Sequence, residues 1–154
     1  MKKHQKQRSA SRIRRSLKRA LSSRPAVAFE VTVTVESDGG YNPRFLGRTN
    51  LPSLMLLTVA LESAAGEQLE EQQVTVQGGR FTTRPFAGYG VAHPPGRYVL
   101  RAIAAAPFLQ PRRVRQLIGE NGQLMTGPLV FEAPIGGRSV CLQQPVELEG
   151  AETV

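Results

Sequence analysis

The strongest structural signal in the chain is a strict alternation of apolar and polar residues. Residues 26–36 read AVAFEVTVTVE, with four valines and a phenylalanine at every second position from Val27 to Val35. Successive side chains of a β-strand point to opposite faces, so a period of two predicts a strand with one buried face. A helix could not gather this set on one side, because its period is 3.6 residues. The folded part of the chain is therefore expected to begin with a half-buried strand.

Turn signals recur at short intervals through the rest of the chain and predict more strands. In residues 54–62 the expected inward set is Leu57, Val59 and Leu61, although the length of this segment also allows a helix. Residues 97–104 are expected to turn Tyr98, Leu100 and Ala102 inward. The remaining predicted strands are residues 45–49, 72–77, 80–84, 129–132, 139–143 and, as an extension of the last, 146–148.

Two local motifs specify a hairpin and a helix. Gly78 and Gly79 tolerate the positive φ angles of a two-residue turn, so residues 72–77 and 80–84 are expected to pair as a hairpin. Proline at the start and glycine at the end bracket one short helix, 111–118. Its expected buried stripe is Val114, Leu117 and Ile118.

Seven or eight short strands with one helix predict an all-β fold, an antiparallel β-sandwich over residues 26–148. Residues 1–25 are expected to form a basic arm and residues 149–154 a loose tail. Three stretches, 49–52 (TNLP), 95–100 (PGRYVL) and 118–122 (IGENG) with 126–130 (TGPLV), resemble bacterial Ig-like and transthyretin-like sandwich modules. The resemblance covers most of residues 27–148. It implies a non-catalytic binding or structural module and carries no catalytic residue to this chain.

The positive charge is concentrated in the arm. The formal net charge is +8, from 20 Lys and Arg against 12 Asp and Glu. Residues 1–25 hold ten of the basic residues and no acidic one, so the remainder has ten basic and twelve acidic residues. The chain is thus a near-neutral body with a cationic arm. The basic residues of the arm are Lys2, Lys3, Lys6, Arg8, Arg12, Arg14, Arg15, Lys18, Arg19 and Arg24.

Four interpretations of the arm remain open. Ile13, Leu17, Ala20 and Leu21 fall at helical spacing, but repulsion among the cations makes an isolated helix marginal. The arm could be a solvated tail, a polyanion-binding segment, a helix on an anionic membrane surface, or a transit-type targeting segment. It has no aromatic residue, so nucleic-acid binding through it would not depend on sequence.

Removal of residues 1–25 tests whether the arm belongs to the folded body. We expect the thermal midpoint to change by less than about 5 °C, since the arm contributes little to the core. Thermal unfolding of the full and truncated chains makes the comparison. A larger fall would mean that the arm packs on the body.

Arginine is the only basic residue after Lys18. Arg80 and Arg84, like Arg97 and Arg101, lie on the expected outward face of their strands, and Arg44 and Arg48 flank a third strand similarly. If these strands are neighbours, one sheet face carries a row of arginines that could bind a polyanion. Genomic base composition and pairing with the twelve acidic residues are the alternative explanations.

The sequence offers little for catalysis. Cys141 is the only cysteine and is expected to be a half-buried strand residue. His93 lies in a proline-flanked loop and is expected to face solvent, as are the acidic residues of segment 62–71. With two histidines and one aspartate we expect no metal site, no cofactor and no enzymatic activity.

The leading hypothesis is a non-enzymatic module that meets a protein partner through sheet faces or edge strands. Its arm would add affinity for something anionic, either nucleic acid or an anionic membrane surface. The alternative is a non-specific nucleic-acid-binding protein that uses the arm and an arginine-bearing sheet face. No apolar run reaches the roughly 18 residues that span a bilayer, and no apolar core follows the basic start. A cytoplasmic location is therefore expected, unless the true start lies upstream and includes an export signal.

Overall fold

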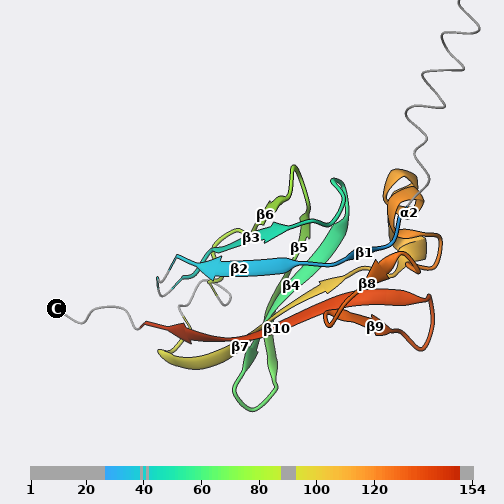
Figure 1. Ribbon diagram of the computed structural model, residues 1–154. Coiled ribbons are helices and arrows are strands. Elements are labelled where there is room, and N and C mark those ends of the chain that lie inside the picture. The colour runs from blue at the N-terminus through green and yellow to red at the C-terminus, as the bar shows by residue number, and fades with distance from the viewer. Residues whose placement is uncertain (1–26, 39, 41, 88–92, 150–154) are drawn as a thin grey trace, which may run out of the picture.

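The computed structural model describes residues 27–38, 40, 42–87 and 93–149, which form mostly β-strands with one α-helix (Figure 1). The arm and the end of the tail lie outside these residues. The described part has ten strands where seven or eight were expected, because the first predicted strand is divided and a two-residue strand was missed. The elements are β1 (Phe29–Glu30), β2 (Val33–Ser37), β3 (Phe45–Thr49), β4 (Leu56–Ser63), β5 (Gln68–Thr75), β6 (Arg80–Thr82), β7 (Gly96–Ala104), η1 (Pro107–Leu109), α2 (Arg112–Ile118), β8 (Met125–Thr126), β9 (Val130–Glu132) and β10 (Arg138–Leu148).

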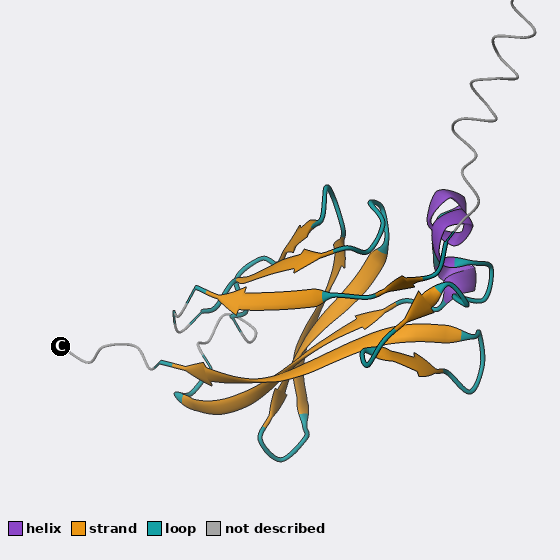
Figure 2. Cartoon of the chain, in the orientation of Figure 1, coloured by secondary structure: helices purple, strands orange, loops and turns teal. Residues whose placement is uncertain are grey.

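The strands form two larger antiparallel sheets and one small parallel pair (Figure 2). The five-stranded sheet has the order β5-β4-β7-β10-β9, and the three-stranded sheet has the order β2-β3-β6. β1 pairs with β8 in parallel. One cluster of buried side chains draws on both larger sheets, so they share a single hydrophobic core.

The predicted first strand is divided between two sheets. Its alternation is confirmed, because Val31, Val33 and Val35 are buried. The division is held by the TNLP stretch. Asn50 accepts a hydrogen bond from Thr32 N at 2.9 Å and donates to the Glu30 carbonyl at 2.7 Å. The motif that suggested a sandwich module therefore fixes the backbone where the chain leaves β1 and enters β2.

The central strands β4 and β7 confirm the predicted inward sets. Leu57, Val59 and Leu61 of β4 are buried, as are Tyr98, Leu100 and Ala102 of β7. The two strands pair directly, so the helical alternative for residues 54–62 is wrong. β10 continues without a break through Pro145. At this position β10 has a neighbour on one side only within the described residues: Pro145 pairs with Val99 of β7, whereas β9 pairs only with residues 138–140.

The predicted hairpin around Gly78 and Gly79 is only partly correct. Both glycines have positive φ, 57° and 78°, and Gln77 and Arg80 face each other across the turn. Beyond this bridge the strands separate, because β5 joins the five-stranded sheet and β6 the three-stranded sheet. The turn reverses the direction of the chain but does not determine which sheet each flanking strand joins.

The short helix α2 follows Pro111 and ends at Gly119 as predicted. Val114 and Ile118 are buried, but Leu117 is exposed, so the predicted stripe is too wide by one residue. The residue that anchors the helical region is Gln110, which is 3% exposed. Its side-chain amide accepts from Leu56 N and donates to the carbonyls of Leu56 and Ala105 at 2.8–3.0 Å.

Candidate functional site

The structure separates the arginines that the sequence grouped together. Nine of the predicted polyanion-binding residues, from Lys2 to Arg19, lie outside the described residues. Arg97 and Arg101 lie on β7 of the five-stranded sheet, whereas Arg80 lies on β6 of the other sheet with Arg84 just beyond it. The predicted single row over Arg80, Arg84, Arg97 and Arg101 is therefore wrong, because β6 and β7 are not neighbours.

The two arginines of β7 are paired with glutamates. Arg101 Nε lies 3.3 Å from Glu62 Oε1, and Arg97 Nε lies 3.5 Å from Glu147 Oε1. When its amide oxygen faces Arg101, Gln143 also accepts hydrogen bonds from this guanidinium. For these two positions, the alternative explanation of intramolecular pairing is confirmed.

The three-stranded sheet has its own arginine cluster on its exposed face. Arg48 on β3 and Arg80 on β6 are direct cross-strand partners. Thr83 N donates to the Phe45 carbonyl at 3.0 Å, and Arg44 and Arg84 are the next residues of the two segments beyond this bond. All four arginines are exposed, since each alternates with a buried neighbour. We call Arg44, Arg48, Arg80 and Arg84 the arginine quartet.

The quartet has no ion-pair partner among the described residues, in contrast to Arg97 and Arg101. Like charges directly opposite each other on a sheet are destabilising, by about 0.2–1 kcal/mol per pair. Arg48 and Arg80 form such a pair. An arrangement that costs stability and is not neutralised within the fold is suited to bind an external anion.

A pocket of about 190 Å³ lies within this face. Leu46, which is 50% exposed, lies two residues before Arg48 on β3, and Thr82 is its cross-strand partner. Among the described residues that line the pocket, Glu36 of β2 is the only acidic one. The pocket thus combines guanidinium donors with an apolar centre and hydroxyl groups. Its lining residues are Thr34, Glu36, Leu46, Gly47, Arg48, Arg80, Phe81 and Thr82.

The sequence predicts two of the four quartet residues as binding residues. Arg80 and Arg84 were predicted, while Arg44 and Arg48 were noted only as flanking a strand. The missing information was the pairing of β3 with β6, which lie far apart in the chain. Gln72 assists this arrangement, because its side chain bonds both the N–H and the carbonyl of Arg84 at 2.9 and 3.1 Å.

His93 is not the solvent-facing residue that was expected. It is 8% exposed, its Nε2 lies 3.2 Å from Glu70 Oε2, and its ring packs edge-on against Tyr98 at a centroid distance of 6.1 Å. The proline-rich sequence gave no sign of this burial. The prediction for the acidic segment is also partly wrong, since Glu62 is buried against Arg101 and Glu70 contacts His93.

Cys141 is half-buried in β10, as predicted. Burial raises the pKa of its thiol above the ordinary value; the positive charge of Arg101 opposes this shift and the negative charge of Glu62 adds to it. A raised pKa keeps the thiol protonated near neutral pH, which disfavours nucleophilic reactivity. This environment fits a structural residue.

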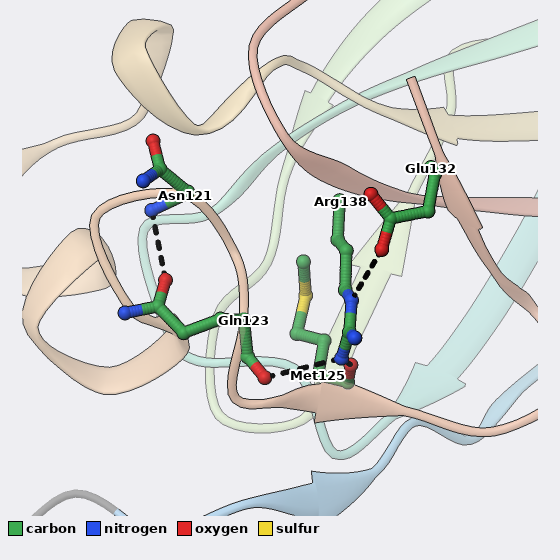
Figure 3. Close-up of polar contacts among 5 residues, drawn as sticks. All are labelled: Asn121, Gln123, Met125, Glu132 and Arg138. Carbon is green, nitrogen blue, oxygen red and sulfur yellow. Dashed lines mark hydrogen bonds and ion pairs between the residues drawn. The ribbon is translucent and has the colours of Figure 1, made fainter. Parts of the chain in front are cut away.

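A second polar cluster surrounds Arg138 at the start of β10 (Figure 3). Its Nε donates to Glu132 Oε1 at 2.9 Å, and its Nη1 donates to the carbonyls of Gln123 and Met125 at 3.3 and 3.4 Å. The Arg138 backbone N–H donates to the Asn121 carbonyl at 2.8 Å. This arginine therefore ties β9, β10 and the loop after α2 together through its backbone N–H, Nε and Nη1.

Within the described ranges, no group of three or more His, Cys, Asp or Glu side chains is placed to hold a metal ion. None of the helices in that part of the chain has the length and apolar content to cross a membrane. Comparison of the chain with protein families, with curated proteins and with solved structures finds no match. The arginine quartet is the best-defined candidate site among the described residues.

Proposed function

We propose that the protein is a non-enzymatic interaction module of the β-sandwich class that binds an acidic surface of a protein partner through the arginine quartet. The observation that carries this proposal is the cross-strand pair Arg48 and Arg80, exposed and without an ion-pair partner among the described residues. The cationic arm would add long-range attraction toward the same anionic partner.

The composition of the face favours a protein partner. Interfaces between proteins combine an apolar centre with arginines and a polar rim. Leu46 supplies the apolar centre, the quartet surrounds it, and Thr34 and Thr82 supply hydroxyl groups. Glu36 at the edge would repel a uniform polyanion and favour a partner whose charges are patterned.

Neutralising the central arginine pair tests the proposal. We expect R48Q/R80Q to bind an acidic peptide containing leucine at least about tenfold more weakly than the unmodified protein, since two charge-assisted contacts are lost. Fluorescence anisotropy of the labelled peptide measures the affinity, and the difference should shrink at high salt. The matched control is R97Q, which removes an exposed arginine that is already paired with Glu147.

Stability provides an independent measurement on the same variants. Because R48Q/R80Q relieves a like-charge contact, its free energy of unfolding should stay equal or rise by up to about 1 kcal/mol. Weaker peptide binding with undiminished stability would support a binding role. Equal peptide affinities for R48Q/R80Q and R97Q would contradict the proposal.

Non-specific nucleic-acid binding is the second candidate, favoured by the quartet together with the ten basic residues of the arm. Among the described residues, the exposed face of the three-stranded sheet has no aromatic side chain for base stacking, so such binding would be independent of sequence. Leu46 distinguishes the two candidates. L46S should weaken binding of the leucine-containing acidic peptide but leave the affinity for a mixed-sequence oligonucleotide unchanged, because phosphate contacts need no apolar partner.

A further inference from the structure

Bulky apolar side chains are exposed together at the end of the molecule that carries the helices. Eight large apolar residues are exposed in the described part of the chain, and five belong to η1, α2, β9 or the loop between β9 and β10. A concentration of this kind marks an interaction surface, whereas single exposed residues are ordinary. The five are Phe108, Leu109, Leu117, Phe131 and Ile135.

The segments that carry these side chains lie against one another. Gly136 packs beside Phe108, so closely that a Cβ at this glycine would lie 3.3 Å from the ring. The contact joins η1 to the loop of Ile135, which is itself 84% exposed. The hydrogen bond from Arg138 N to the Asn121 carbonyl ties the same loop to the turn after α2. Figure 1 shows α2 and the β9–β10 loop at one end of the sheets.

This end also carries uncompensated positive charge. Residues 105–138 contain four arginines and two glutamates. Glu132 pairs with Arg138 at 2.9 Å, and Glu120 lies 3.7 Å from Arg115. Arg112 and Arg113 remain exposed on α2 without an ion pair within the described residues. We call Phe108, Leu109, Leu117, Ile135, Arg112 and Arg113 the apolar–basic end.

The described chain begins at this same end. Phe29 N, close to the start of the described chain, donates to the Leu124 carbonyl in the turn beyond α2 at 2.9 Å. The preceding 25 residues bring ten further basic side chains and no acidic one. Apolar side chains and two arginines without an ion pair among the described residues thus lie at the end where the described chain begins.

We propose that the apolar–basic end binds the surface of an anionic lipid bilayer. Phe108, Leu109 and Ile135 would enter the boundary between headgroups and acyl chains, while Arg112 and Arg113 contact lipid phosphates. The arm would add electrostatic attraction to the same surface. A bilayer is favoured over an acidic protein because it presents many equivalent anions beside apolar chains and requires no fixed complementary shape.

Vesicle co-sedimentation of the full chain tests this proposal. We expect binding to phosphatidylcholine vesicles that contain phosphatidylglycerol and little binding to phosphatidylcholine alone. F108S/I135S should bind the anionic vesicles about tenfold more weakly or worse, because two inserted apolar side chains are lost. The matched control is L46S, which removes a similarly exposed apolar side chain from the three-stranded sheet and should bind like the unmodified protein.

The remaining outcomes separate the body from the arm and a bilayer from a protein. R112Q/R113Q should weaken binding to the anionic vesicles and reduce its dependence on salt. If F108S/I135S binds as well as L46S and only removal of residues 1–25 abolishes binding, the arm alone contacts lipid and the proposal is wrong. Failure of the full chain to bind anionic vesicles would also overturn it, and would point to a protein as the occupant of this end.

Discussion

Replacement of Gln110 by leucine is expected to destabilise the protein by about 2–4 kcal/mol, lowering the thermal midpoint by on the order of 10 °C. Gln110 is buried, and its amide satisfies the N–H of Leu56 and the carbonyl of Ala105. Leucine has a similar size but leaves both backbone groups without these partners. A buried polar group that loses its hydrogen bond costs about 1–3 kcal/mol. Thermal and urea unfolding measure the change.

The control is the same substitution on the exposed face of α2. Q116L replaces a solvent-facing glutamine and should change the free energy of unfolding by less than about 0.5 kcal/mol. Q110E adds a sharper test, because a carboxylate can accept from Leu56 N but cannot donate to the carbonyls. Its deficit relative to the unmodified protein should shrink as the pH falls and the carboxyl group gains a proton. A Q110L variant as stable as Q116L would show that this anchor contributes nothing.

Local patterns in the sequence predicted most individual strands, because alternation and turn residues act over a few positions. β3 matches its predicted span, and Leu57, Val59 and Leu61 face inward as expected. The division of the first strand was not predicted, since it depends on the Asn50 side chain reaching the backbone of Glu30 and Thr32. Strand formation is local, but assignment of a strand to a sheet is not.

The candidate site likewise depends on strand pairing that local sequence patterns do not predict. The outward parity of Arg80 and Arg48 could be read from the chain, but their pairing depends on the register between β3 and β6. Arg101 has the same local pattern and instead lies beside Glu62. Whether an arginine is neutralised or available to bind is thus decided by long-range strand order. His93 was misjudged for a similar reason, because its partner Glu70 belongs to a distant strand.

Gly47 is the position where adding one methyl group should have a large effect. It lies directly opposite Phe81 in the register of β3 and β6, and a Cβ at this position would lie only 2.0–2.4 Å from three carbons of the Phe81 ring. Because Phe81 is 3% exposed, its ring cannot move aside without disturbing the core. We expect G47A to cost about 2–3 kcal/mol in the free energy of unfolding, as for other overpacked cores.

A double-mutant cycle separates this clash from the intrinsic effect of alanine in a strand. F81A alone should cost about 3–5 kcal/mol by leaving a cavity, but it also vacates the space above Gly47. Introducing G47A into F81A should then cost far less than G47A alone, giving a coupling of at least about 1 kcal/mol by urea unfolding. If the unfolding free-energy costs of G47A and F81A were additive, the Phe81 ring would not require a glycine at position 47. Since the same pairing places Arg48 beside Arg80, a strong coupling would also support the register on which the arginine quartet depends.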